Sequence, residues 1–159
     1  MNNQLMMEEE IKKIFKAAQK TQAGKIVGMM KPYFVRCDFD EKSLTVGFDI
    51  EEWELNPQNI MHGGMICTAF DNVFGTLTHF FSGESFITTV EISVHYHKPV
   101  FVGDKIEITV KPTHAGRTIV GFTGELRVAN RQMLLCATSS TTYMKLAGKK
   151  TALYKDDGK

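Results

Sequence analysis

The sequence predicts an α+β domain in which a curled antiparallel sheet wraps around one long central helix. Residues 63–81 carry apolar side chains around most of a helical circumference, so this helix must be buried. Most of the remaining chain alternates apolar and polar residues in segments that short turns connect. Short turns favour antiparallel neighbours, and the concave face of a sheet is the one surface large enough to bury such a helix. With 159 residues, 43% of them hydrophobic and 23% charged, the chain fits one compact domain.

The elements follow from the N-terminus in a simple order. Leu5, Ile11 and Ile14 recur at helical spacing between charged residues, which predicts a helix that Gly24 ends, within an N-terminal helical extension at residues 1–30. The domain itself is expected at residues 31–147. It begins with a hairpin of strands at 33–39 and 44–50, and after the buried helix it continues with strands at 86–97, 105–113, 118–128 and 133–144. Residues 148–159, rich in Lys and Asp, are expected to form a solvated tail.

Composition excludes several classes of function. A formal net charge of +1 provides no general field for binding nucleic acid. No apolar run reaches membrane-spanning length and the N-terminus is charged where a secretory signal is apolar, so we expect a cytoplasmic protein without a membrane partner. Cys37, Cys67 and Cys136 are widely spaced, which favours buried small side chains over a disulfide framework or a thiolate metal site. His95 and His97 share a strand face without a third donor, so we predict outer-face polar residues and no metal.

Two adjacent glycines, Gly63 and Gly64, stand where the buried helix begins. Glycine is a weak helix former, so its presence there needs a reason. One explanation is that bare backbone N–H groups at the positive end of the helix dipole receive an oxygen that gains negative charge, such as a thioester carbonyl under attack. The other is that the glycines relieve crowding between helix and sheet. The spacing alone leaves both open.

A carboxylate, Asp71, lies in the middle of the same apolar helix. It belongs to a stripe of small and polar residues at spacings of three or four: Thr68, Asp71, Asn72, Gly75 and His79. Burying an unpaired charge costs several kcal/mol. Asp71 therefore either pairs with a cation or caps a neighbouring backbone group, or it serves as a general base or nucleophile.

The spacing of these two features implies two chains. Gly63 and Asp71 are eight residues apart, which is roughly 12 Å along one helix. Catalysis on one carbonyl carbon would need both groups within about 3 Å of the reacting atoms. If two copies pair about a twofold axis with antiparallel helices, Gly63 of one can lie beside Asp71 of the other. An active protein is thus expected to be at least a dimer.

Together these residues resemble a known family. His62-Gly63-Gly64, then Asp71-Asn72 in one apolar helix, then a strand ending in Tyr-His-Lys-Pro at 96–99 and Gly-Asp at 103–104 are similar to the hotdog-fold acyl-CoA thioesterases of the 4HBT superfamily, in particular its PaaI-like and THEM2-like group. The resemblance covers residues 33–145. It implies a hotdog fold, hydrolysis of an acyl-CoA to a free acid and coenzyme A, no cofactor apart from the coenzyme A of the substrate, and a homotetramer.

The resemblance also implies roles for single residues. The Gly63 N–H would polarise the thioester carbonyl with His62 as a supporting group, and Asp71 of the opposing subunit would activate water or attack the carbonyl directly. Asn56 would orient the thioester or the attacking water. Thr89 takes the place of a Ser that contacts that water, although plain alternation turns Thr89 away from the helix, so this role requires a bulge.

Substrate-binding groups are expected around this centre. Gly64 adds a second amide, and Arg117 and Lys98 are candidates for holding a coenzyme A phosphate at the rim, unless they are ordinary exposed cations. Two other functions stay open. One is a hotdog dehydratase or hydratase, which hydration of crotonyl-CoA would reveal. The other is a non-catalytic acyl-CoA-binding module, which would not need Asp71.

Overall fold

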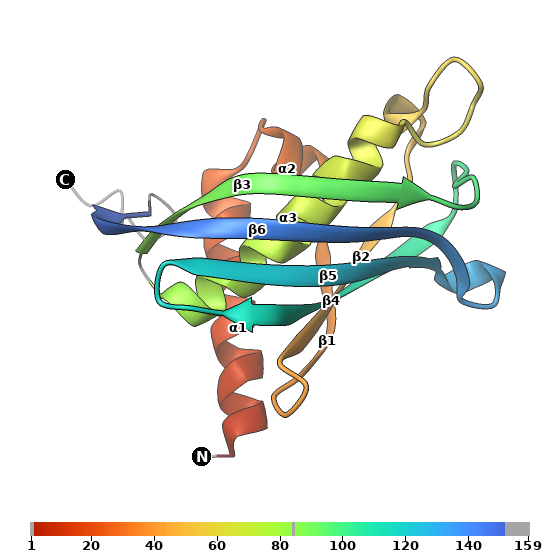
Figure 1. Ribbon diagram of the computed structural model, residues 1–159. Helices are drawn as coiled ribbons and strands as arrows, with labels where there is room; N and C mark the ends of the chain where they lie inside the picture. The colour runs from red at the N-terminus through yellow and green to blue at the C-terminus, as the bar shows by residue number, and fades with distance from the viewer. Residues whose placement is uncertain (1, 84, 152–159) are drawn as a thin grey trace.

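The protein forms a six-stranded antiparallel sheet around one long helix, and the computed structural model describes residues 2–83 and 85–151 of the chain (Figure 1). Its strand order is β1-β2-β4-β5-β6-β3. The strands are β1 Tyr33–Asp38, β2 Ser43–Asp49, β3 Ser85–Tyr96, β4 Lys105–Ala115, β5 Ile119–Val128 and β6 Leu134–Lys150. The helices are α1 Asn3–Thr21, α2 Ile26–Met30 and α3 Gly63–Ser82, with 3-10 turns at Glu52–Glu54 and Ala129–Arg131. The predicted fold class is confirmed.

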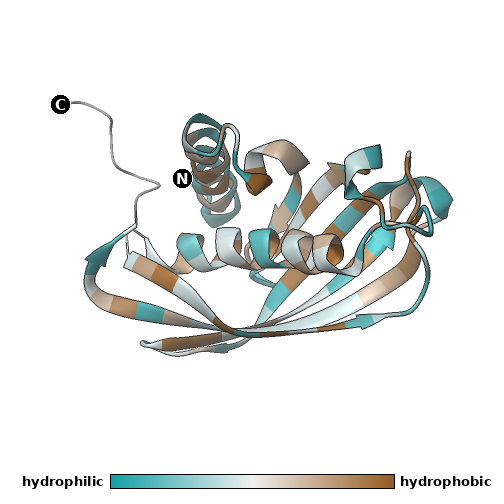
Figure 2. Cartoon of the chain, turned by 90° about the horizontal axis from the view of Figure 1, so that it is seen from above, coloured by the Kyte–Doolittle hydropathy of each residue, from teal (hydrophilic) through white to brown (hydrophobic). Residues whose placement is uncertain are grey.

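Helix α3 lies in the concave face of the curved sheet (Figure 2). Its apolar side chains at four-residue spacing, Ile66, Phe70 and Phe74 among them, are buried in the core. The Phe70 and Phe74 rings stack at 5.9 Å between centroids, and Phe74 reaches Phe122 of β5 at 6.0 Å. Each fully buried side chain of this size contributes about 1.5–3 kcal/mol to the stability of the fold. The packing of these rings therefore fixes the position of α3 and of the polar groups along it.

The N-terminal extension is part of the core. Met7 and Ile11 of α1 are fully buried with the residues of α3 and the sheet. The side chain of Gln4 donates to the carbonyl of Cys37 at 2.8 Å and accepts from the Phe39 amide at 2.8 Å, which ties α1 to the end of β1. Helix α1 ends at Thr21, and Gly24, with φ of +75°, lies in the turn to α2 rather than at the helix end. Helix α2 was not predicted, because five residues are too few to show a helical period.

The last strand extends past residue 148, where the sequence predicts the start of the tail. Strand β6 continues through Gly148 to Lys150, which pairs with Ser85 at the start of β3. Thr151 is only 8% exposed. Residues 148–150 are exposed, but they extend β6 and do not form a separate tail, and residues 152–159 lie outside the described residues. Pairing with β3 carries the strand through a segment whose own sequence is weakly apolar.

Strand β3 forms one edge of the sheet and contains a bulge. Thr89 pairs with Tyr143 of β6, whereas Glu91 pairs with Thr142, so Val90 is an extra residue in the ladder. Because of the bulge, the residues before Val90 face the opposite side of the sheet from the one that plain alternation predicts. Thr89 consequently points toward α3, as its predicted role requires.

Two negative findings concern the described residues only. Within ranges 2–83 and 85–151, no helix is long and apolar enough to cross a membrane. Cys136 is buried, Cys37 and Cys67 are half-buried, and all three are free thiols.

Candidate active site

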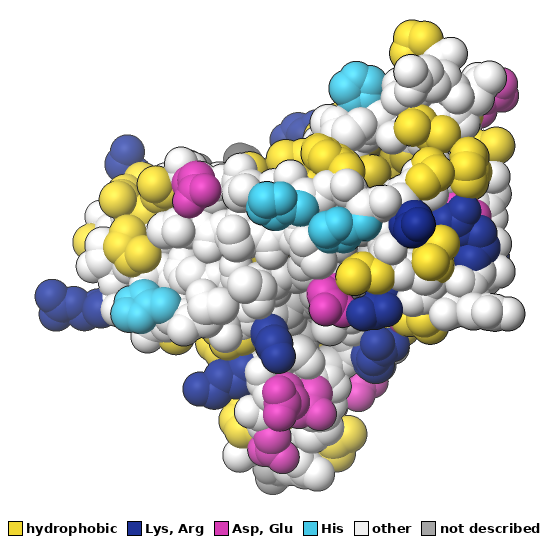
Figure 3. Space-filling view, turned by 45° about the vertical axis from the view of Figure 1, so that its right-hand side comes forward, with side chains coloured by type: hydrophobic (Ala, Val, Ile, Leu, Met, Phe, Trp, Pro, Cys, Tyr) yellow, Lys and Arg dark blue, Asp and Glu magenta, His cyan; other side chains and the backbone are white. Residues whose placement is uncertain are grey.

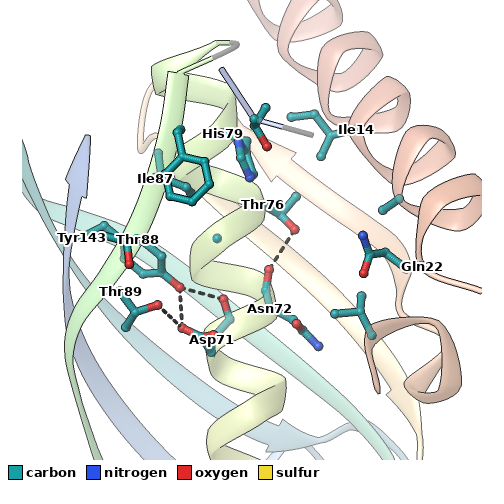
Figure 4. Close-up of a pocket in the computed structure, with 15 residues that line it drawn as sticks. Ile14, Gln22, Asp71, Asn72, Thr76, His79, Ile87, Thr88, Thr89 and Tyr143 are labelled. Carbon is teal, nitrogen blue, oxygen red and sulfur yellow. Dashed lines mark hydrogen bonds between the residues drawn. The ribbon is translucent and has the colours of Figure 1, made fainter. Parts of the chain in front are cut away.

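The carboxylate of Asp71 is held on α3 by two hydroxyl groups from the sheet (Figure 4). Its Oδ1 accepts a hydrogen bond from Thr89 Oγ1 at 2.9 Å and one from Tyr143 Oη at 2.5 Å. Its Oδ2 accepts none from the described residues and is not among the buried atoms that lack a partner, so it stays accessible. None of the ion pairs found in the described part of the chain involves Asp71. One oxygen is thus anchored and the other is free, which suits a general base or a nucleophile.

Tyr143 was missed in the sequence analysis. It lies on β6, where Ser139, Thr141 and Tyr143 alternate onto the buried face of the sheet. Burial raises the pKa of its phenol above the ordinary value of 10.0, and the neighbouring Asp71 carboxylate raises this pKa further. The phenol therefore remains a protonated donor. The signal was present in the sequence, because a tyrosine on a buried strand face usually needs a partner for its hydroxyl.

We expect Tyr143→Phe to lower kcat roughly tenfold or more with little change in KM. The variant removes one hydrogen bond to a charged group, worth about 1.5–3 kcal/mol, without removing the ring that packs against Phe122. Steady-state kinetics test this, with Tyr33→Phe as the control because Tyr33 donates to Asp49 on the exposed surface. An equal loss in both variants, or a loss in KM alone, would contradict a positioning role for Tyr143.

The N-terminus of α3 presents one free backbone amide. His62 caps the helix, and its Nδ1 accepts from the Gly64 amide at 2.9 Å. The carbonyl of His62 accepts from the amides of Met65 and Ile66 at 2.8 and 3.1 Å. No described group accepts from the Gly63 amide. The Gly64 amide, expected to bind substrate, is engaged by His62 here, and Gly63 provides the amide that is free.

Crowding explains the two glycines in the structure, and the oxyanion explanation stays a prediction. A Cβ at Gly63 would lie 3.3 Å from the ring of Tyr96, whose hydroxyl donates to the Gly63 carbonyl at 2.8 Å. A Cβ at Gly64 would lie 3.1 Å from His62 Nδ1. The glycines relieve crowding, and at Gly63 the same close approach leaves a bare N–H beside a pocket.

That pocket has a volume of about 460 Å³ and is lined by Asn56, Gly63, Tyr96 and Lys98, among others. Asn56 Oδ1 accepts from the amides of Gln58 and Ile60 at 2.9 and 3.3 Å, so this oxygen holds the loop before α3. Among the described residues, none accepts a hydrogen bond from Asn56 Nδ2. Asn56 and Gly63 line the same pocket, and the role of Asn56 toward a substrate stays a prediction.

The two candidate cations lie at opposite ends of β3. Lys98 lies two residues past the end of the strand and lines the pocket beside Gly63. Arg117 is exposed in the β4–β5 turn. The next residue, Thr118, accepts through its carbonyl from the amide of Lys145. Because Lys145 pairs with Ile87, this turn lies near the start of β3. A strand of 12 residues spans about 40 Å, so one chain cannot place both cations on the same phosphate.

His95 of β3 and His97, which directly follows the strand, show no metal arrangement. His97 Nε2 shares a hydrogen bond with Thr138 Oγ1 at 2.9 Å, and His95 is exposed. Among the residues that the structure describes, no group of three or more His, Cys, Asp or Glu side chains could hold a metal ion.

Asp71 lines a different pocket from Gly63. This second pocket, also about 460 Å³, lies between α1, α3 and the β3–β6 pair, and the two pockets share no lining residue. One chain thus separates the free amide from the carboxylate, as their eight-residue spacing requires. The two groups that the sequence predicts to act together therefore lie at the start and in the middle of one helix.

Comparison with known proteins gives the family. Residues 58–135 match the family model of the thioesterase superfamily. The resemblance to thioesterases of this superfamily that was stated from the sequence is confirmed over these residues. No curated protein sequence matches the chain significantly.

Solved structures share the hotdog fold. The PaaI protein of the E. coli phenylacetic acid degradation operon superposes with a TM-score of 0.72 at 17% identity, covering 87% of this chain and 97% of its own. Thioesterase superfamily member 2 from Mus musculus gives 0.70 at 18% identity, covering 82% and 93%. The protein smu.793 of Streptococcus mutans, solved bound to acetyl-CoA, gives 0.65 at 22% identity, covering 76% and 92%.

Proposed function

We propose that this protein is an acyl-CoA thioesterase that hydrolyses an acyl-CoA to a free carboxylic acid and coenzyme A. The observation that carries the proposal is the Asp71 carboxylate, with Oδ1 held by two hydroxyls and Oδ2 free beside a pocket. The superfamily match and the acetyl-CoA complex of the S. mutans relative support the substrate class. We place the reaction in the cytoplasm.

The chemistry needs only a base or nucleophile and a donor for the oxyanion. Asp71 removes a proton from water while the water oxygen bonds to the thioester carbon, or its own Oδ2 forms that bond and water then hydrolyses the anhydride. The carbonyl oxygen gains negative charge, which the Gly63 N–H and the helix dipole stabilise. The C–S bond breaks as this tetrahedral adduct collapses, which in the second route precedes hydrolysis of the anhydride, and coenzyme A leaves as a thiolate, which is a good leaving group. Thr89 and Tyr143 keep the carboxylate in position.

Two protomers are required for this reaction, and β3 is the surface that supports their pairing. It is a long edge strand with exposed apolar side chains: Phe86 is 40% exposed, and Val90 and Tyr96 are each 54% exposed. Such an edge offers unpaired N–H and C=O groups to another strand. Figure 3 shows a band of hydrophobic side chains where this side of the molecule meets the protruding loop.

The contacts along β3 support one register for this pair. Thr89 contacts Asp71 and Tyr96 contacts Gly63, at two positions of the same strand. In an antiparallel pair of β3 strands with its twofold axis between residues 92 and 93, Thr89 lies opposite the partner subunit's Tyr96. The bulge at Val90 shifts this pairing by one residue at most. Asp71 then lies on the same side as the partner subunit's Gly63. The same operation brings the Arg117 turn toward the partner subunit's Lys98, so that both cations can reach one coenzyme A. We propose a homotetramer built from two such dimers.

The experiment is a free-thiol assay over acetyl-, hexanoyl-, palmitoyl- and benzoyl-CoA, with and without EDTA. We expect coenzyme A release from at least one class at a rate that EDTA does not change, and a dimer or tetramer by light scattering. Hydration of crotonyl-CoA without thiol release would instead indicate a hydratase. Acyl-CoA binding without turnover would indicate a binding module.

A further inference from the structure

The pocket beside Asp71 is closed on one side by helices that lie outside the family match. Ile14, Ala18 and Gln22 of α1 and Val27 of α2 line it, whereas the match begins at residue 58. Figure 4 shows Ile14 and Gln22 across the cavity from Asp71. The N-terminal helices therefore form a wall of the candidate site that lies outside the matched residues 58–135.

The pocket continues into the protein at this wall. A void of about 40 Å³ shares Ile14, Ala18 and Val27 with the pocket and extends between Phe48 and Val73 of the core. A third cavity, between α1 and α2, also includes Ala18 and Val27. Ala18 thus borders three adjoining spaces, so we expect a larger apolar side chain there to occupy part of them.

A glycine on the opposite wall also leaves space open. Gly75 stands one turn after Asp71 in the interior of α3, where glycine is unfavourable. A Cβ at Gly75 would meet only Tyr143 Oη within 4 Å, at an ordinary contact distance of 3.7 Å. Packing within the chain therefore does not require a glycine. Its effect is to enlarge the pocket next to the carboxylate.

The lining beyond Asp71 carries no charge. His79 also lines this pocket, and burial lowers its pKa to about 4, so it is neutral at physiological pH. The remaining wall is apolar or hydroxyl- and amide-bearing, including Ile87, Thr76 and Asn72. By contrast, the pocket beside Gly63 contains Lys98. The uncharged pocket suits an acyl chain and the other suits the coenzyme A end.

We propose that helices α1 and α2 enclose the acyl group of the substrate, and that the small residues Ala18 and Gly75 set the size of acyl group the site accepts. The inference rests on the proposed function and deepens it. It commits to an uncharged, mainly hydrocarbon acyl group larger than acetyl, held by the protomer that supplies Asp71.

The test compares Ala18→Leu with Ala17→Leu. Ala17 precedes Ala18 on α1 and lines none of the pockets described above, so the same substitution there is a matched control. We expect Ala18→Leu to lower the ratio of kcat/KM for hexanoyl-CoA to kcat/KM for acetyl-CoA at least tenfold, and Ala17→Leu to leave it within twofold. Gly75→Ala should lower the ratio in the same direction. Thermal unfolding and light scattering show whether each variant keeps its fold and oligomeric state.

The outcomes separate this inference from the proposed function. If the wild type releases coenzyme A but Ala18→Leu and Gly75→Ala keep its ratio, the inference is wrong and the thioesterase proposal stands. If the wild type hydrolyses no acyl-CoA, the proposed function fails, and the binding of hexanoyl-CoA, measured by the rise in Tm that it causes, tests the inference instead. A smaller hexanoyl-CoA-induced rise in Tm for Ala18→Leu than for the wild type then supports an acyl pocket at α1, and an equal rise overturns it.

Discussion

Replacing Asp71 by Asn is expected to lower kcat for acyl-CoA hydrolysis by roughly a hundredfold or more, because removal of a positioned acid–base group typically costs 10² to 10⁴. The amide has nearly the shape of the carboxylate. Its oxygen can still accept from Thr89 Oγ1 and Tyr143 Oη, so the fold should be preserved. The amide can neither take a proton from water nor attack the thioester.

The control for this variant is Asp40→Asn, the same chemical change in the exposed turn between β1 and β2. Its kcat should equal that of the wild type. Tm measurements should show both variants within a few degrees of the wild type. A loss in Asp71→Asn of less than about tenfold, with the fold intact, would show that this carboxylate does not carry the reaction.

Elements defined by a local pattern could be predicted from the sequence. Helix α3 was expected at residues 63–81 and is found at Gly63–Ser82, because its apolar coat is a property of the segment itself. The polar stripe through Asp71, Asn72 and Gly75 indeed lines a pocket. A stripe of small and polar residues on an otherwise apolar helix must face something other than the core.

Features that depend on pairing between distant segments could not be predicted. The bulge at Val90 is set by the register of β3 on β6, and it alone decides whether Thr89 faces the helix or solvent. The contact of Tyr143 with Asp71 joins residues 72 positions apart. Similarly, the Gly64 amide is taken by the His62 ring, and only the conformation of the cap shows that Gly63 has the free amide. Sequence periodicity contains none of this information.

The composite nature of the site leads to a complementation experiment with a large expected effect. Gly63→Pro deletes the free amide while suiting the backbone, because proline is favoured at the first residue of a helix. The preceding residue, His62, has φ of −59° and ψ of 134°, the extended conformation that a following proline requires. We expect Gly63→Pro to lose nearly all activity. Gly63→Ala, which keeps the N–H and needs only a small shift of the exposed Tyr96 ring, should retain most of it.

Co-expression of Gly63→Pro with Asp71→Asn should then restore about a quarter of the wild-type activity, although each variant alone is nearly inactive. Random pairing makes half of the dimers mixed, and each mixed dimer has one site with both an intact amide and an intact carboxylate and one site with neither. Two different affinity tags allow the mixed dimer to be purified, and its specific activity should be half that of the wild type. If each chain contained a complete site, both chains of the mixed dimer would be inactive, and no recovery would occur. Recovered activity therefore requires that the amide at the start of one α3 and the carboxylate in the middle of the other act on the same thioester.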